Sequence, residues 1–286
     1  MAFRAREVAQ AAQAACLLEV SAPKPGNVSP YADFADARYE DFVLSAAAIG
    51  PAFLQAGRAS VGRTIYRAIR DTRRWVRTNT NLGIVLLLAP LAKAALQPGS
   101  LRENLSRVLA GLTVEDARLT YAAIRMARPG GLGRVAEGDV TKEVHLTLRE
   151  AMALARERDA IAREYVTDFA ITFEIGYPAL REAWDATRSP ATAVVEAFLQ
   201  ILARVPDTLI ARKRGFETAF EVSRRAAEVL EAGGVRTPAG RQAIAALDRM
   251  LRDEGHTLNP GTTADLTTAA LFLFLLQDRA LLAGSL

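Results

Sequence analysis

Four polar, glycine-bearing segments interrupt a chain that is otherwise rich in apolar residues, and they hold most of the side chains that could do chemistry. The first, residues 21–28, reads Ser-Ala-Pro-Lys-Pro-Gly-Asn-Val. Two prolines stiffen this turn, and its glycine lets a ligand approach the backbone closely. Lys24 and Asn27 are therefore candidates for binding a phosphate or carboxylate. The alternative is a helix stop that carries a surface lysine.

The second segment, residues 78–83, reads Thr-Asn-Thr-Asn-Leu-Gly and directly precedes an apolar run. Asn79 and Asn81 are residue types that favour helix N-caps, so a capping role is the structural interpretation. A helix N-terminus with free N–H groups is also an anion site, and side-chain amides there can bind a sugar or a base. The sequence leaves both interpretations open.

The third segment, residues 206–215, reads Pro-Asp-Thr-Leu-Ile-Ala-Arg-Lys-Arg-Gly. Asp207 or Thr208 could cap a helix that begins here. On such a helix Asp207 and Arg214 share one face, with Thr208 and Lys213 nearby. A carboxylate beside a cationic cluster is what a magnesium–triphosphate site requires, so Asp207 is a candidate metal ligand. Thr208 and Lys213 are candidate phosphate-binding residues.

The fourth segment, residues 258–266, reads Leu-Asn-Pro-Gly-Thr-Thr-Ala-Asp-Leu and leads into the most apolar helix predicted in the chain. Asp265 is expected in the first turn of that helix, where the helix dipole favours a carboxylate. Asn259 and Gly261 are candidate ligand contacts in the turn. Helix capping by the two threonines is the structural alternative.

Helices must position these segments, because the helical period of apolar residues recurs almost everywhere and no alternating strand of useful length is found. The sequence predicts an all-α fold of roughly a dozen helices in a single compact domain, residues 1–286. Residues 100–103 and 113–116 have the form of capping boxes. Residues 130–139 form a long loop that could be a hinge or a lid, and 176–178 could end one helix or start the next. The predicted helices are 2–20, 39–56, 61–76, 82–95, 101–110, 115–127, 147–154, 158–175, 190–203, 208–232, 238–254 and 263–282.

Composition excludes several classes of protein. Half of the residues are hydrophobic and 24% are charged, which is typical of a globular protein and not of a disordered one. The net charge of +4 comes almost entirely from arginines, which are dispersed, so a solvated surface or an anion cleft is expected and nucleic-acid binding is not. The single cysteine, Cys16, excludes a disulfide scaffold, and two histidines far apart argue against a histidine metal site.

Localisation follows from the apolar runs at 82–92 and 266–276. Each is shorter than the roughly 20 residues that a membrane span needs. The N-terminal residues 1–19 are charged and lack a cleavage signature, so they predict an amphipathic helix and not a signal peptide. We therefore expect a cytoplasmic protein with no membrane partner. The run at 266–276 could form part of the core or the interface of a homodimer.

Taken together, the motifs resemble the ATP:dephospho-CoA triphosphoribosyltransferase family over most of the chain. The resemblance implies an all-α enzyme that joins the ribose C1 of ATP to the ribose 2′-hydroxyl of 3′-dephospho-CoA and releases adenine. The residues that carry it are Pro23-Lys24-Pro25-Gly26, Asp36, Phe42, Ser45, Asn79-Thr80, Gly176-Tyr177-Pro178, Asp207-Thr208 with the basic segment to Gly215, Pro260-Gly261 and Ala264-Asp265-Leu266.

Two departures from the family pattern leave the acceptor open. The typical family segment Asn-Thr-His-Lys-Gly has Asn81 and Leu82 in place of histidine and lysine here. The family's Gly-Ala-Arg-Gly-Glu element is absent, and residues 171–174 stand near its place. The sequence thus indicates a divergent branch. A ribosyl or phosphoribosyl transferase with another acceptor, for example in methanopterin-type cofactor biosynthesis, and a non-catalytic nucleotide-binding scaffold are the alternatives.

The resemblance also suggests roles for the candidate residues. Positive charge develops at the ribose C1 when the N-glycosidic bond breaks, so a carboxylate is needed to stabilise it and a second to accept the acceptor's proton. Asp36 and Asp265 are the candidates for these two tasks. Lys24 and Lys213 would bind phosphate, and Asp207 would hold Mg²⁺. The ribose or the base would be oriented by Asn79, Asn81 and Asn259.

Overall fold

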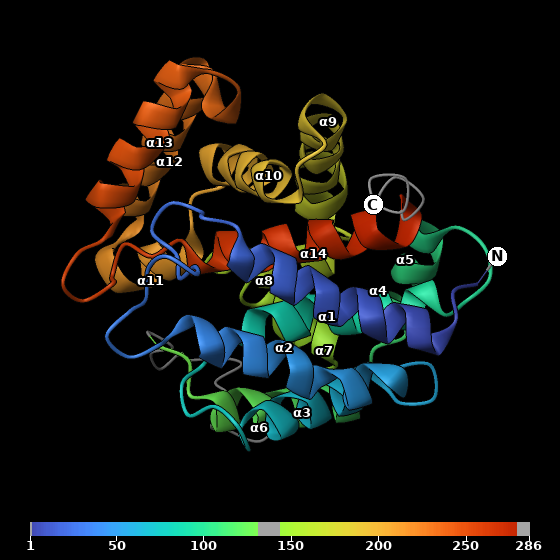
Figure 1. Cartoon of the computed structure of the whole chain (residues 1–286). Coiled ribbons are helices and arrows are strands. Elements are labelled where there is room, and N and C mark those ends of the chain that lie inside the picture. The colour runs from blue at the N-terminus through green and yellow to red at the C-terminus, as the bar shows by residue number, and fades with distance from the viewer. Residues whose placement is uncertain (1, 131–143, 279–286) are drawn as a thin grey trace. The chain divides into compact units, whose positions relative to one another are not determined.

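The computed structural model describes residues 2–130 and 144–278, and within these ranges it contains fourteen α-helices and no strand (Figure 1). The only extended pairing in the described residues is an isolated bridge between Ser29 and Ala32. The predicted all-α fold is confirmed. Most of the predicted hinge or lid at 130–139 lies outside the described residues. No helix in the described part of the chain is long and apolar enough to cross a membrane.

The chain divides into two compact units by its internal contacts. Unit 1 comprises Met1–Leu17 and Glu40–Phe169, and unit 2 comprises Leu18–Tyr39 and Ala170–Leu286. Helix α1 (Ala5–Ser21) therefore begins in one unit and ends in the other. That these units together form the single predicted domain remains a prediction.

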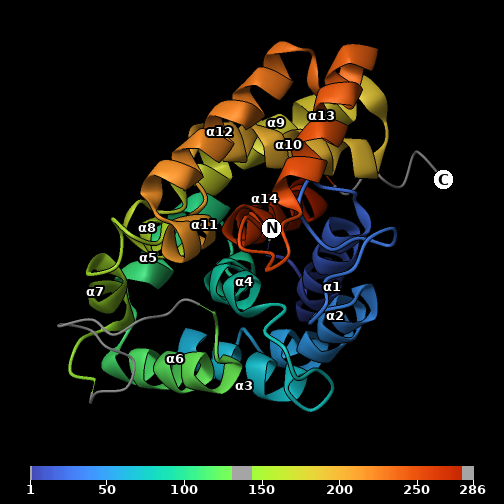
Figure 2. The ribbon, with the colours of Figure 1, turned by 90° about the vertical axis from the view of Figure 1, so that its left-hand side faces the viewer.

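Unit 1 is organised around α4 (Leu82–Ala95), an apolar helix that is buried along nearly its whole length. Helices α3 and α6 pack side by side, α3 also contacts α4, and α5 and α8 contact α4 (Figure 2). Gly62 allows the close approach of α3 to α6, because a Cβ there would lie 2.4 Å from the carbonyl oxygen of Asp116. The other helices of this unit are α2 (Tyr39–Leu54), α3 (Val61–Thr72), α5 (Leu101–Ala110), α6 (Val114–Ala127), α7 (Leu148–Ala153) and α8 (Ala160–Val166).

Unit 2 is built on α14 (Gly261–Gln277), which contacts α9, α10, α11 and a short π-helix. Every residue from 266 to 276 is buried within the single chain, which supports a core role for this run over an exposed interface. The remaining elements are the π-helix (Thr172–Gly176), α9 (Tyr177–Thr187), α10 (Pro190–Arg204), α11 (Thr208–Arg214), α12 (Phe216–Glu231), a 3₁₀-helix (Gly234–Arg236) and α13 (Pro238–Leu251).

Two predicted helices are interrupted. The predicted helix 208–232 is two helices, α11 and α12, separated by Gly215 with φ +91°. The predicted helix 158–175 breaks where Asp168 and Phe169 adopt positive φ values of 51° and 63°. Tertiary bonds hold that break, since the Asp168 carboxylate accepts from Ser106 Oγ at 2.9 Å and from Arg149 Nη2 at 3.1 Å. The periodicity of the sequence continues through both breaks, which is why it did not reveal them.

Helix ends differ from the predictions by a few residues. Helix α4 has the predicted bounds, and Pro178 lies in the first turn of α9, so 176–178 starts a helix. Thr113 and Asp116 form the predicted capping box, whereas Ser100 occupies the N-cap position of α5 without a side-chain bond. Because α14 begins at Gly261, Asp265 lies in the second turn and not in the first as predicted.

Candidate functional site

The first and fourth polar segments contact each other in unit 2, although more than 200 residues separate them. Gly26 adopts φ +71°, and its N–H donates to Asp248 Oδ1 at 2.8 Å. A Cβ on Gly26 would lie 2.7 Å from Leu251 Cβ and 3.1 Å from Pro260 Cδ. The loop is therefore packed against the end of α13 and against the turn that precedes α14, and this position has no space for a side chain.

Arg252 and Asn27 complete this junction. The Arg252 guanidinium donates to the carbonyl oxygen of Asn27 at 2.9 Å and to Asp248 Oδ2 at 3.0 Å. The side-chain amide of Asn27 is buried and donates to the carbonyl oxygen of Pro25 at 3.0 Å. The side chain of Asn27, a predicted ligand contact, thus stabilises the turn by a hydrogen bond inside it.

Lys24 is buried, with only 1% of its surface exposed. Its ammonium donates to Glu19 Oε1 at 3.0 Å, to the carbonyl oxygen of Ala22 at 3.1 Å, and to the carbonyl oxygen of Glu19. All three N–H groups therefore have acceptors, two of them carbonyls at the C-terminal end of α1, where a cation is favoured by the helix dipole. Burial raises the pKa of Glu19, and the charge of Lys24 opposes that rise. Lys24 holds the loop to the end of α1.

Asp207 joins the third and fourth segments. Its Oδ1 accepts from the backbone N–H groups of Leu209 and Ile210 at 2.8 and 3.0 Å, as an N-cap of α11 does. Its Oδ2 accepts from the backbone N–H and the hydroxyl of Thr263 at 2.7 and 2.8 Å. Burial raises the pKa of this carboxyl, and the bonds from Thr263, Ile210 and Leu209 oppose the rise. The carboxylate clamps the start of α11 to the start of α14.

This clamp bears on the predicted magnesium site. A carboxylate that binds Mg²⁺ must offer a free oxygen at octahedral geometry, and each oxygen of Asp207 already accepts two hydrogen bonds. In the described ranges no group of three or more His, Cys, Asp or Glu residues could hold a metal ion. The described residues do not fit a protein-coordinated Mg²⁺ at Asp207, and that role remains a prediction from the sequence.

Lys213 differs from Lys24 because it is exposed, near the C-terminal end of α11. Its ammonium donates to the carbonyl oxygen of His256 at 3.1 Å, which ties the third segment to the loop before α14. Among the described residues the ammonium has this one acceptor for its three N–H groups, so Lys213 can bind a further anion. Thr208 lies at the other end of α11, where its hydroxyl lies 3.2 Å from that of Thr262.

His256 is a residue of this cluster that the sequence analysis did not propose. Its ring stacks on Phe34 with centroids 4.0 Å apart, and its Nε2 accepts from the backbone N–H of Ala35 at 3.3 Å. A neutral imidazole that accepts at Nε2 carries its proton on Nδ1. That Nδ1 is buried without a partner among the described residues. From the sequence, the two histidines argue against a histidine metal site and against a Ser-His-Asp triad, and nothing in their spacing reveals a contact with residue 34.

The turn before α14 carries a second polar atom of this kind. Asn259 Oδ1 is buried without a partner among the described residues. Gly261 donates its N–H to the carbonyl oxygen of Asn259 at 2.8 Å, and a Cβ on Gly261 would lie 2.7 Å from Leu209 Cδ2. The two candidate carboxylates flank the cluster in sequence: Asp265 is half-buried, and Asp36 is exposed next to Ala35. Unpartnered polar atoms cost free energy, so a bound polar ligand would stabilise this cluster.

The second polar segment belongs to unit 1. Asn79 Oδ1 accepts from the backbone N–H of Leu82 at 3.2 Å, which satisfies the first N–H of α4. Asn81 is buried and donates to Thr72 Oγ1 at 3.1 Å. Thr80 Oγ1 lies 2.6 Å from Ser45 Oγ, so two further residues of the family resemblance contact each other. Asn81 occupies the N-cap position of α4 without a side-chain cap bond, and Asn79, two residues earlier, accepts from the first N–H of the helix. A role of either residue in ligand binding remains a prediction from the sequence.

Comparisons with known proteins cover most of the chain. The sequence model of the ATP:dephospho-CoA triphosphoribosyl transferase family (CitG) matches residues 5–282. A 2-(5''-triphosphoribosyl)-3'-dephosphocoenzyme-A synthase from Klebsiella pneumoniae is 27% identical over an alignment of 279 residues that covers 91% of this chain and 91% of its own. A protein of Malonomonas rubra, provisionally given the same name, is 25% identical over 95% of this chain and 88% of its own.

A solved structure has a similar fold and sequence. The crystal structure of a candidate triphosphoribosyl-dephospho-CoA synthase from Archaeoglobus fulgidus superposes with a TM-score of 0.63 and 31% identity. The match covers 81% of this chain and 96% of the other. The fold and the sequence together define an all-helical protein from a family of transferases. The chain belongs to the ATP:dephospho-CoA triphosphoribosyl transferase family.

Proposed function

We propose that this protein transfers the triphosphoribosyl group of MgATP to the 2′-hydroxyl of 3′-dephospho-CoA and releases adenine. The observation that supports this most is the convergence in unit 2 of three motif segments on which the family resemblance rests. The loop at 23–27 packs on Pro260, and Asp207 bonds Thr263. Residues that are distant in sequence and shared with a nucleotide-using family thus form one polar cluster, whose unpartnered atoms call for a ligand.

The reaction needs two carboxylates, and Asp265 and Asp36 are the proposed pair. The bond between the ribose C1 and adenine N9 breaks, and its electron pair leaves with the adenine, which gains a proton. A carboxylate stabilises the positive charge that develops at C1. The bond between C1 and the acceptor oxygen forms, and the second carboxylate takes the hydroxyl proton. Both carboxylates belong to the unit that holds the polar cluster.

Binding is divided among the other residues of the cluster. Lys213 and the arginines beside it are proposed to bind the triphosphate. Thr208 and Gly261, the first residues of α11 and α14, are proposed to contact it as well. The Nδ1–H of His256 and the Oδ1 of Asn259 offer a donor and an acceptor for the ribose or the base. Lys24, Asn27 and Asp207 are proposed to hold the three segments together. Mg²⁺ is proposed to arrive with the phosphates as MgATP, as it often does in proteins.

The activity is tested by incubating purified protein with MgATP and 3′-dephospho-CoA and following the products by mass spectrometry. We expect free adenine and an adduct with the mass of triphosphoribosyl-dephospho-CoA, both lost when Mg²⁺ is chelated. Release of adenine with another acceptor only, such as a pterin, would support the second acceptor hypothesis, which the Asn81-Leu82 departure motivates. Binding of ATP without adenine release under any acceptor would reject an enzymatic function.

The carboxylate assignment is tested by Asp265→Asn and Asp36→Asn. Each is expected to lower kcat by roughly 10²-fold or more, because an amide neither stabilises the charge at C1 nor takes the proton. Asp185→Asn, at an exposed position of α9, is the matched control and should keep full activity. Unchanged turnover in a folded Asp265→Asn protein would remove that residue from the mechanism. Sedimentation at several concentrations tests the homodimer that the sequence left open.

A further inference from the structure

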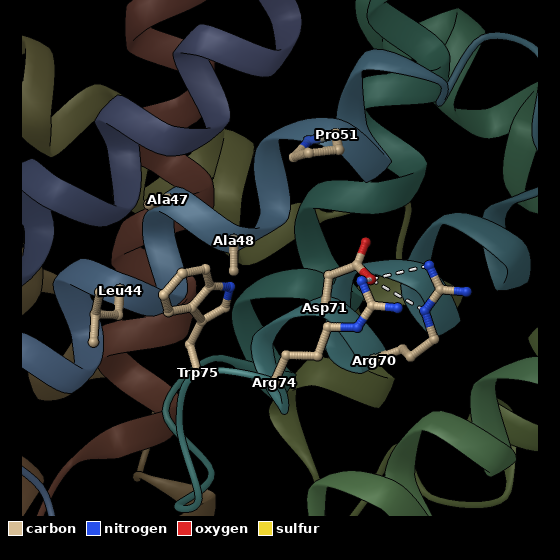
Figure 3. A pocket seen from close by; sticks show the side chains of 8 residues that line it. All are labelled: Leu44, Ala47, Ala48, Pro51, Arg70, Asp71, Arg74 and Trp75. Carbon is tan, nitrogen blue, oxygen red and sulfur yellow. Dashed lines mark hydrogen bonds and ion pairs between the residues drawn. The ribbon is translucent and has the colours of Figure 1, made fainter.

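A cavity of about 460 Å³ lies in unit 1, away in sequence from the cluster described above (Figure 3). Small and apolar residues of α2 form one wall, and the end of α3 with the residues after it forms the other. This volume falls in the range of pockets that bind small molecules. The residues that line it are Leu44, Ala47, Ala48, Pro51, Arg70, Asp71, Arg74 and Trp75.

The indole of Trp75 borders the cavity and is largely exposed, at 67% of its surface, facing Ala48 in Figure 3. The other tryptophan of the chain, Trp184, is only 2% exposed. An aromatic ring of this size left open to water forgoes the free energy of burial that a flat ligand would supply. The alanines across from it leave room for such a ligand to lie against the indole.

The wall of the cavity that carries Trp75 also carries positive charge. Arg70 donates to Asp71 Oδ1 through Nε and Nη2 at 3.1 and 3.0 Å, so this pair is largely neutral (Figure 3). Arg74 Nη1 lies 3.6 Å from the same oxygen, too far for a hydrogen bond, and its side chain is 68% exposed. The guanidinium of Arg74 makes no hydrogen bond with the described residues, so its N–H donors can take an anion.

We propose that this cavity binds an adenine nucleotide, with the base stacked on Trp75 and a phosphate on Arg74. Stacking on an aromatic ring and a forked contact from arginine to phosphate are the two interactions that recognise a nucleotide without reading its identity. The choice of adenine rests on the proposed function, in which both substrates are adenine nucleotides. The cavity then adds a second adenylate-binding position to the chain.

The test uses the intrinsic fluorescence of the full-length protein, because only Trp75 of the two tryptophans is accessible. Adding 5′-AMP is expected to quench the emission in a saturable manner. Adenosine and inorganic phosphate should each bind at least about tenfold more weakly, since each lacks one of the two contacts. Trp75→Phe should abolish the signal, and calorimetry should show weaker binding of 5′-AMP to it.

Two charge variants, one at the cavity and one on α3 outside it, distinguish a specific site from a general effect of charge. Arg74→Gln is expected to weaken 5′-AMP binding about tenfold, whereas Arg63→Gln, exposed on α3 outside the cavity, should leave it unchanged. Equal loss in both variants, or no saturable quenching in the parent protein, would overturn the proposal. The proposal would also be overturned if a second copy of the protein covers Trp75, in which case Trp75→Phe would change the sedimentation coefficient.

Adenine release from MgATP distinguishes failure of this site from failure of the proposed function. If 5′-AMP does not bind at Trp75 but adenine is released, the cavity proposal is wrong and the transferase activity stands. If 5′-AMP quenches Trp75 and no acceptor supports adenine release, the site stands and the proposed activity does not.

Discussion

The two lysines of unit 2 that the sequence suggested for phosphate binding have opposite environments. Lys24 is buried, and all three of its N–H groups have acceptors in Glu19 and Ala22. Lys213 is exposed, and within the described residues its ammonium donates only to the carbonyl oxygen of His256. The residue type and the polar, glycine-bearing context are the same in both segments. Burial and the number of occupied donors distinguish a lysine that holds the fold from one that can bind a ligand.

The same contrast extends to the segments around them. The loop at 23–27 is enclosed, since Gly26 has no space for a Cβ and its N–H is held by Asp248. The end of α11 is open, since a Cβ on Gly215 would meet nothing within 4 Å. We infer that the first segment provides rigidity and that the third provides the accessible cations. The predictions below test this division.

The largest effect is expected for Lys24→Met. Removing the ammonium leaves the buried Glu19 carboxylate without its partner, and breaking a buried ion pair in this way costs about 3–5 kcal/mol of unfolding free energy. Urea unfolding of the purified protein measures the loss. The double variant Glu19→Gln with Lys24→Met is the control and should regain a large part of it. A loss no greater than that of an exposed lysine would contradict the structural role.

The pH dependence of this variant has a defined sign. Burial raises the pKa of Glu19, and Lys24 opposes the rise, so removing Lys24 raises that pKa further. A raised carboxyl pKa means that the folded state binds the proton more tightly than the unfolded state does. Ionisation of the carboxyl therefore destabilises the folded state, and this destabilisation reaches its full size only at a pH above the folded pKa. The destabilisation by Lys24→Met should therefore be greatest near neutral pH and should shrink as the pH falls toward the ordinary value of the carboxyl, 4.5. A destabilisation that grows on acidification would be inconsistent with this account.

Asp207→Asn is expected to have the next largest effect. An asparagine has one side-chain oxygen that can accept hydrogen bonds. Its amide nitrogen would take the place of the other carboxylate oxygen and would face two donors that now bond that oxygen. Several buried donors would lose their partner, at about 2–4 kcal/mol in total. Thr263→Val removes only the hydroxyl bond of the clamp and should cost about 1 kcal/mol. Thermal unfolding compares the two. Loss of turnover without loss of stability would instead favour the magnesium role predicted from the sequence.

Much of the fold and part of the cluster could be predicted from the sequence, and particular residues explain the rest. The continuous run of apolar residues located α4 to the residue, because the helix is buried along nearly its whole length. The period of apolar residues missed the break at Asp168, since the bonds that hold it come from Ser106 and Arg149 elsewhere in the chain. The polar segments were found by composition, but whether a polar side chain is free depends on partners distant in sequence, as for Lys24, Asp207 and His256.

The two glycines allow a more moderate test of the enclosed and the open segment. Gly26→Ala places a Cβ at φ +71° and 2.7 Å from Leu251 Cβ, so backbone strain adds to a clash, and we expect a loss of about 2–3 kcal/mol. Gly215→Ala meets backbone strain at φ +91° but no neighbouring atom, and about 1–2 kcal/mol is expected. Chemical unfolding of both variants measures the difference. Equal losses would show that strain alone decides and that the loop at 23–27 is not enclosed.

The smallest effect on stability and the clearest effect on binding are expected for Lys213→Gln. The side chain is exposed, so its replacement should change the unfolding free energy by less than about 0.5 kcal/mol. Loss of a charge-assisted contact to the triphosphate should raise the KM for MgATP roughly tenfold, with kcat nearly unchanged. Lys213→Arg keeps the charge and should keep most of the affinity. Lys24→Met is expected to change mainly the unfolding free energy, whereas Lys213→Gln is expected to change mainly the KM. Measuring both quantities for both variants therefore distinguishes the roles of the two lysines. A KM that Lys213→Gln leaves unchanged would move the triphosphate away from the end of α11.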